Sequence, residues 1–326
     1  SVAETGTTDT FTVVLDKGPL TDVVFTITSA DTGEATVTST LTFTSANWDT
    51  AQTVTVTGVD DDIIDGTQST AISIAIDDAN SNDSFDGVAN QAVSVSTTDD
   101  DVAGFTIVES SGSTSVDESG TTDTFTVVLD AQPDSDVVLS ISSSDSGEAT
   151  TASLLTFTSA NWDTAQTVTI TGVDDNLIDG TITSTLTLAV VDAITDDNFD
   201  SVADQTVSVT TTDDDVAGFT IVESSGSTSV DESGTTDTFT VVLDAEPASD
   251  VVLTIASSDT GEATVTSTLT FTSANWDTAQ TVTVTGADDD LIDGTITSTV
   301  TVSVNDGISD NNFDSVSDQT VSVATT

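Results

Sequence analysis

The sequence predicts an all-β protein: tandem immunoglobulin-like β-sandwich domains that follow one another in an elongated rod. Short segments rich in Thr, Val and Ile alternate polar and apolar residues at period two, which is typical of half-buried strands. No stretch has a helical period. The pattern also recurs, because Trp48, Trp162 and Trp276 are each separated by 114 residues.

In the middle repeat, each expected strand has alternating apolar positions and a turn sequence on either side. The seven expected strands cover residues 105–109 with a continuation near 114–116, then 123–129, 136–142, 153–158, 166–171, 184–191 and 206–211. Seven such strands with one solvated face each are typical of a two-sheet sandwich.

A period of 114 residues is the size of an independent domain rather than of a stacked solenoid repeat. The predicted domains are residues 1–101, 102–215 and 216–326. The first lacks its first strand, and the third stops before its terminal Asp triplet, so we expect a longer array. Only a short segment, 101–105, separates the first two domains, which leaves little slack at the joint.

The charge of the chain excludes several function classes. It has 57 Asp and Glu residues against one Lys or Arg and no His, for a formal charge of −56. Nothing is available to neutralise the phosphates of a nucleic acid or the surface of an anionic membrane. There is no Cys, and no apolar run is long enough for direct membrane insertion.

Strand parity places many of the acids at one pole of each sandwich, because successive loops of an antiparallel sandwich alternate between its two ends. In the middle repeat, the turn at 116–120, the loops at 145–148 and 174–180, and the exit at 213–215 all fall at the same end. Without basic residues nearby, such a cluster repels itself unless cations intervene. Carboxylate and carbonyl oxygens favour Ca²⁺, with Mg²⁺ as the second choice.

These residues resemble the Calx-beta family. The shared motifs are Val-x-Glu-x-x-Gly at the first turn, Asp-Asp-x-(apolar)₂-Asp between the fifth and sixth strands, and a terminal Asp-Asp-Asp. The resemblance covers nearly all of each repeat and implies a Calx-beta-like sandwich with Ca²⁺ bound at the terminal pole. The family is known from sodium–calcium exchangers and from tandem arrays in bacterial surface proteins.

Carried over residue by residue, the resemblance implies metal ligands in every repeat. The implied ligands are Glu118, Asp174, Asp175, the carbonyl of Leu177, Asp179, Asp213, Asp214 and Asp215 in the second repeat; Glu4, Asp60, Asp61, Asp65, Asp99, Asp100 and Asp101 in the first; and Glu232, Asp288, Asp289 and Asp293 in the third. The loop that holds Glu148 is shorter than is usual in the family, so Glu148 is a further candidate whose role is left open.

The leading functional interpretation is a structural or adhesive segment of a secreted, cell-surface protein, stiffened by Ca²⁺ at its poles and joints. Its partners would be calcium ions and the neighbouring repeats, and assembly with other copies in a fibre or matrix is left open. The alternative is a Ca²⁺-sensing regulatory module, against which the near-identity of the repeats argues. We do not expect an enzyme, because only carboxylate pairs are available for catalysis and each is better used as a cation ligand.

Overall fold

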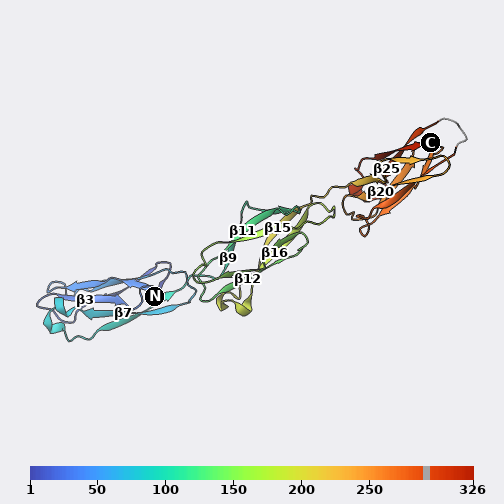
Figure 1. The fold of residues 1–326 in the computed structure, drawn as a ribbon. Helices are drawn as coiled ribbons and strands as arrows, with labels where there is room; N and C mark the ends of the chain where they lie inside the picture. Colours follow the sequence, from blue (N-terminus) through green and yellow to red (C-terminus); the bar gives the residue numbers. More distant parts are fainter. Residues whose placement is uncertain (289–293) are drawn as a thin grey trace.

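The computed structural model describes residues 1–288 and 294–326. Strands and short 3₁₀ helices are its regular elements, and they form three bodies that follow one another in a row (Figure 1). The fold class predicted from the sequence, tandem β-sandwich domains, is confirmed. Among the described helices, none has the length and apolar character needed to cross a membrane.

The middle body shows the arrangement in full. Its elements are β9 (Phe105–Glu109), β10 (Thr114–Asp117), β11 (Thr122–Leu129), β12 (Val137–Ser143), β13 (Ala149–Thr151), β14 (Leu154–Phe157), β15 (Gln166–Gly172), β16 (Ile182–Val190), η3 (Asp192–Ile194), η4 (Asp197–Phe199) and β17 (Gln205–Thr212). One sheet has the strand order β13-β15-β11-β9, and the other has the order β10-β17-β16-β12-β14. These two sheets are the layers of the sandwich.

The third body has the same two sheets, and the first has them without a counterpart of β9. The first has β1 (Val2–Ala3), β2 (Thr8–Val13), β3 (Val23–Ser29), β4 (Ala35–Val37), β5 (Thr40–Phe43), β6 (Gln52–Gly58), β7 (Gln68–Ile76), η1 (Asp78–Asn80), η2 (Asp83–Phe85) and β8 (Gln91–Thr98). The third has β18 (Phe219–Glu223), β19 (Thr228–Val230), β20 (Thr236–Leu243), β21 (Val251–Ser257), β22 (Ala263–Val265), β23 (Thr268–Phe271), β24 (Gln280–Gly286), β25 (Ile296–Val304), η5 (Asn311–Phe313) and β26 (Gln319–Thr325).

Two details of the strand prediction were wrong. The segment 105–116 is not one continuing strand, because β9 pairs with β11 in one sheet while β10 pairs in parallel with β17 in the other. The short strand β13 was also missed. At three residues it is too short to give a readable alternation, and its pairing with β15 defines it instead.

The core of each body lies between its two sheets. Along β11, Phe125, Val127 and Leu129 point inward and are buried, while the residues between them are more exposed. Phe199 is fully buried in the same core, and Trp162 packs against it. The carbonyl of Trp162 also accepts a hydrogen bond from the backbone N–H of Leu129. Both aromatic residues therefore have a structural role in the sandwich.

Candidate metal centre

Glu118 is placed at the acidic pole by the strand that precedes it. β10 pairs in parallel with β17, and the backbone N–H of Glu118 continues the ladder by donating to the Thr212 carbonyl at 3.0 Å. Since β17 runs directly into the Asp triplet, Glu118 meets those acids. The opposite neighbour is Gly172, where an added Cβ would come within 2.1 Å of the Asp117 carbonyl. Only glycine permits this close approach.

Two groups of three carboxylates meet at the pole of the second repeat, and they share Glu118. Their potential ligand oxygens lie within 4.8 Å of one another in each group: Glu118, Asp175 and Asp215 form one group, and Glu118, Glu148 and Asp179 form the other. The first repeat also has two groups that share a glutamate, Glu4 with Asp99 and Asp101, and Glu4 with Glu34 and Asp65. In the first of them Asp99, the equivalent of Asp213, takes the place of Asp61, the equivalent of Asp175. The pole thus has two adjoining candidate positions for a cation.

Asp213 fixes the loops that carry these carboxylates. One oxygen accepts the backbone N–H of Gly180 at 2.8 Å, and the other accepts the backbone N–H of Asp215 at 2.8 Å. Gly180 has φ 78°, a conformation that residues with a Cβ atom rarely adopt. A single carboxylate therefore joins the loop after β15 to the exit of β17, and it orients Asp179 and Asp215 toward Glu118.

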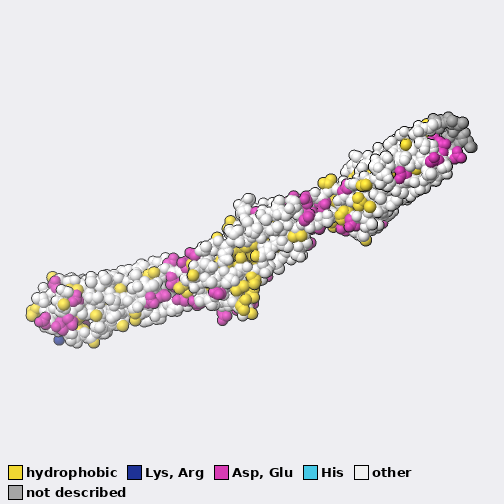
Figure 2. Space-filling model, viewed as in Figure 1, with side chains coloured by type: hydrophobic (Ala, Val, Ile, Leu, Met, Phe, Trp, Pro, Cys, Tyr) yellow, Lys and Arg dark blue, Asp and Glu magenta, His cyan; other side chains and the backbone are white. Residues whose placement is uncertain are grey.

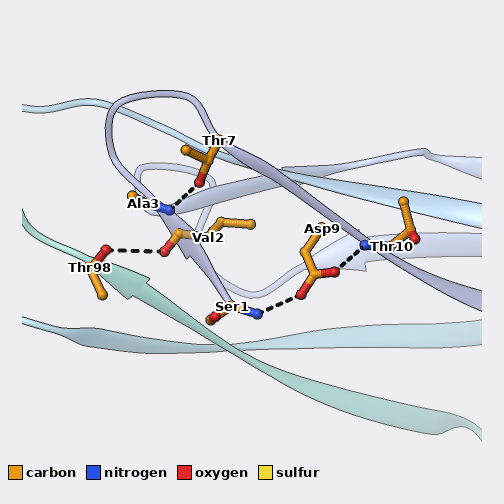
Figure 3. A network of polar contacts seen from close by, with 7 residues as sticks. All are labelled: Ser1, Val2, Ala3, Thr7, Asp9, Thr10 and Thr98. Atoms are coloured by element: carbon orange, nitrogen blue, oxygen red, sulfur yellow. Dashed lines mark hydrogen bonds and ion pairs between the residues drawn. The ribbon is translucent and has the colours of Figure 1, made fainter.

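In the first repeat a polar network holds β1 next to the pole (Figure 3). The N-terminal amine of Ser1 donates to Asp9 Oδ2 at 2.8 Å, and the backbone N–H of Ala3 donates to Thr7 Oγ1 at 2.6 Å. The Thr98 hydroxyl on β8 donates to the Val2 carbonyl at 3.5 Å. Glu4 follows directly, so these contacts set its position among the acids.

Several of these carboxylate oxygens are buried and have no hydrogen-bond partner in the described part of the chain. They are both oxygens of Glu4, Oε2 of Glu34, Glu118 and Glu148, and Oδ2 of Asp101 and Asp215. Glu4 and Glu118 are each only 1% exposed. Buried polar atoms are normally paired, so this set of orphaned acceptors needs an explanation.

The pKa values of these carboxyl groups also indicate that their ionised forms are unfavourable in the buried cluster. Burial, followed by the charge of Asp213, raises the pKa of Glu118 to about 7. In the first repeat, burial and Asp99 raise the pKa of Glu4 to about 7 and that of Asp101 to about 6. Burial likewise raises the pKa of Glu34, Asp65, Glu148, Asp179 and Asp215. Desolvation and mutual repulsion both disfavour the ionised forms.

A hard divalent cation fits this donor set. The groups offer carboxylate oxygens, which are the ligands of Ca²⁺ and Mg²⁺. Neutralisation by a basic side chain is not available, because Lys17 is the only Lys or Arg in the chain. The orphaned oxygens point to the same conclusion, since a bound cation would satisfy acceptors that no N–H or O–H reaches.

The structure separates the predicted ligands into inner and outer members. Asp60, Asp100, Asp174 and Asp214 are exposed, and they act on Asp101 or Asp215 only by charge repulsion. Asp61 and Asp175 each accept a backbone N–H two residues on, from Ile63 at 2.9 Å and from Leu177 at 2.7 Å. Asp99 accepts the N–H groups of Gly66 and Asp101.

The third repeat is only partly described at this pole. Glu232 follows β19, and its backbone N–H donates to the Thr326 carbonyl at 3.1 Å. Asp288 is exposed. The predicted ligands Asp289 and Asp293 lie outside the described residues, so the role of this pole remains a prediction.

Sequence reasoning missed Glu34 and its equivalent Glu262. Both are buried, and Glu34 belongs to one of the carboxylate groups of the first repeat. The signal was present, because each lies one period of 114 residues from Glu148. Glu148 itself, whose role the sequence left open, lies in a group with Glu118 and Asp179.

The loop that carries Asp175 and Asp179 also forms the joint to the next repeat. Ile178 packs against the core of the third body, and Leu177 forms a parallel bridge with Glu246. The backbone N–H of Glu246 donates to the Asn176 carbonyl at 2.6 Å. A second hydrogen bond across the joint comes from Asn312 in the third body, whose Nδ2 donates to the Ile178 carbonyl at 2.8 Å.

The first joint has the same construction. Ile64 packs against the middle core, Ile63 bridges Gln132, and Asn198 Nδ2 donates to the Ile64 carbonyl at 3.2 Å. Acidic side chains gather where each body meets the next (Figure 2). The slack segment 101–105 therefore does not make the joint alone, because a loop from the acidic pole inserts into the following body.

No protein-family model matches the chain, and no curated protein matches it. Among solved structures, it is similar to CBD12 from CALX1.2, with 12% identity, 67% of this chain and 99% of that chain covered, and a TM-score of 0.28. Similarity to domains 4–9 of surface layer protein SbsC has 18% identity, covers 96% and 40% of the two chains, and has a TM-score of 0.29. The titin I-band fragment I67–I69 gives 10% identity, 100% and 94% coverage, and a TM-score of 0.30. At such scores these likenesses carry no argument about function.

Proposed function

We propose that this chain is a segment of an extracellular structural or adhesive rod whose stiffness depends on Ca²⁺ bound at the acidic poles. The observation that carries the proposal is the set of buried carboxylate oxygens without hydrogen-bond partners around Glu118 and Glu4. A charge cluster of this kind is stable when ionised only if a cation compensates it. The motif resemblance to Calx-beta domains supports calcium as that cation.

Each complete pole would hold two ions that share one glutamate. Glu118 would contribute to both, with Asp175 and Asp215 on one side and Glu148 and Asp179 on the other. Asp213 would orient the two loops, because its oxygens accept two backbone N–H groups. Its equivalent Asp99 accepts the same pair and also lies in a carboxylate group of the first repeat. Bound calcium would neutralise the carboxylates, and water and backbone carbonyls would complete its coordination.

Calcium binding would reach the joint through one loop. Asp175 and Asp179 flank Ile178, which packs on the next core, so ordering the carboxylates also orders the contact between bodies. Without the cation, repulsion among the acids would act on that same loop. A rod role follows, because a repeated joint that stiffens on ion binding determines the length and stiffness of the whole array.

We further propose that the chain is not an enzyme and that it acts outside the cell. Its polar clusters offer only carboxylates, and the same cluster recurs in successive repeats, which suits a repeated structural element. Extracellular calcium modules bind at about 10⁻⁴–10⁻³ M, whereas sensors bind near 10⁻⁷–10⁻⁵ M. The affinity therefore separates a rod from a regulatory Ca²⁺-sensing module.

Small-angle X-ray scattering of the full chain, in millimolar Ca²⁺ and after chelation, tests the proposed function. We expect the scattering profile of an extended, stiff chain in calcium and that of a more flexible chain without it. Circular dichroism should show that the β-sandwich structure is retained in both conditions. Identical scattering in both conditions would contradict calcium-dependent stiffening. Tight binding in the sensor range would instead favour the regulatory alternative.

A further inference from the structure

Aspartate is followed directly by glycine at five points in the sequence. In the described part of the chain the complete pairs are Asp65-Gly66, Asp86-Gly87, Asp179-Gly180 and Asp306-Gly307, and Asp293 of the fifth lies outside it. Such a pair is chemically labile when it can move, because the glycine nitrogen can reach the aspartate side chain with no Cβ atom in the way. The surroundings of each pair therefore decide whether it reacts.

Two of the pairs are restrained at the acidic poles. The N–H groups of Gly66 and Gly180 each donate to a carboxylate oxygen of an Asp triplet, at 2.7 and 2.8 Å. Asp65 and Asp179 each lie in a group of three carboxylates. Hydrogen bonds to an ionised acceptor are among the strong ones, so the glycine nitrogen is held away from the aspartate side chain before it.

The other two pairs lie in exposed turns. Asp306 follows the end of β25, Asp86 follows η2, and both are exposed together with the glycine after them. Within the described residues, neither glycine N–H donates a hydrogen bond and neither carboxylate accepts one. Nothing lies within 4 Å of a Cβ added at Gly87, and at Gly307 the nearest atom is Asn305 Oδ1 at 3.8 Å. Exposed turns of this kind have the freedom that the reaction needs.

The same two turns in the other repeats provide a comparison. The equivalents of Asp306 are Asp78 and Asp192, and each is followed by Ala. The equivalents of Asp86 are each followed by Ser, at positions 201 and 315. The aspartate is thus present in every repeat, but at each turn only one repeat has the glycine.

We propose that Asp306 and Asp86 are sites of spontaneous isomerisation to isoaspartate, whereas Asp179 and Asp65 are protected. The Gly307 nitrogen attacks Cγ of Asp306, a new N–C bond forms, and the amide proton leaves with the carboxyl hydroxyl as water. Water then adds to either carbonyl of the resulting succinimide. Cleavage at the side-chain carbonyl restores aspartate, and cleavage at the main-chain carbonyl leaves isoaspartate. One water leaves and one adds, so no further reactant is needed.

The modification at position 306 inserts one methylene group into the main chain of a turn near the second joint. In this turn the N–H groups of Ile308 and Ser309 both donate to the Asn305 carbonyl, at 3.1 Å. The turn leads to η5, where Asn312 Nδ2 donates to the Ile178 carbonyl across the joint. A longer main chain no longer matches the two turn hydrogen bonds, so we expect this contact to weaken as the protein ages.

The test incubates the full chain at neutral pH in millimolar Ca²⁺ and in water enriched in heavy oxygen. Peptide mapping with electron-transfer fragmentation distinguishes isoaspartate from aspartate, and hydrolysis of a succinimide marks its site with one heavy oxygen. We expect isoaspartate to accumulate at Asp306 and Asp86. Asp179 and Asp65 should react at least about ten-fold more slowly, because a charge-assisted hydrogen bond must break first.

Gly307→Ala is the matched variant, since it gives the third repeat the Asp-Ala sequence of the other two, and Gly87→Ser does the same for the first repeat at its turn. Each variant should slow isomerisation several-fold at its own site and leave the other site unchanged. Absence of isoaspartate and of heavy oxygen at both exposed sites would overturn the proposal. Unchanged rates in both variants would overturn it as well, and so would equal rates at the exposed pairs and at the pairs of the acidic poles.

Discussion

The first and second repeats have nearly the same acidic pole but different cores. Glu4 and Glu118 are equally buried, and the pKa of each is raised to about 7. In contrast, Phe11 is half-buried where Phe125 is fully buried. The strand before each glutamate and the acidic loops therefore organise the pole. The burial of Phe125 depends in addition on β9, which pairs with β11 in the second repeat.

The largest expected effect tests that contrast directly. Phe125→Ala should destabilise the second repeat by about 3–5 kcal/mol, because it leaves a cavity in a filled core. Phe11→Ala should cost the first repeat only about 1–2 kcal/mol, because the ring is already partly in water. Chemical denaturation followed by hydrogen-exchange mass spectrometry resolves the repeats, and equal costs would contradict the contrast.

Gly172→Ala should destabilise the second repeat by about 1–3 kcal/mol, since the new methyl group meets the Asp117 carbonyl and displaces β10. It should also weaken calcium binding, because Glu118 follows that strand. Gly87→Ala is the control, with nothing within 4 Å of its added Cβ, and it should change stability little. The same denaturation measurement compares them, and indistinguishable variants would mean that β10 is not held by this approach.

Ile178→Ser should loosen the second joint at a cost of about 1–2 kcal/mol, because its side chain packs on the third core. Scattering of this variant in calcium should show greater flexibility than wild type. Ile194→Ser removes an isoleucine that is 62% exposed and should leave the profile unchanged. If both variants scatter like wild type, Ile178 does not stiffen the joint.

A smaller effect is expected from pH. In the calcium-free protein, the raised pKa values of Glu4 and Glu118 mean that the folded state binds their protons more tightly than the unfolded state does. Their contribution to stability is present below the unfolded pKa near 4.5 and is lost as pH rises toward about 7. Thermal melts in chelator should therefore show lower stability at pH 8 than at pH 5.5. Saturating calcium should reduce or reverse this trend, since it binds the ionised carboxylates. An identical trend with and without calcium would disconnect these glutamates from the ion.

Much of this architecture could be predicted from sequence, because period-two alternation and the 114-residue period are local signals. Strand parity was sufficient to bring Glu118, Asp175 and Asp215 to one pole. Glu34 was missed because a single Glu in a short turn has no signal of its own beyond its place in the repeat. The insertion of Ile64 and Ile178 into the next body was also missed, since an apolar pair within an acidic loop does not reveal which surface it contacts.

The most direct test of the central claim is a calorimetric calcium titration of the full chain beside two variants. Wild type should bind at about 10⁻⁴–10⁻³ M, with two ions at each complete pole. Glu118→Gln should weaken binding at the second repeat by about ten-fold or more, because both carboxylate groups lose their shared member. Asp163→Asn removes an exposed acid outside these groups and should bind like wild type. A chain that takes up no calcium, or a Glu118→Gln variant that binds as wild type does, would contradict the claim.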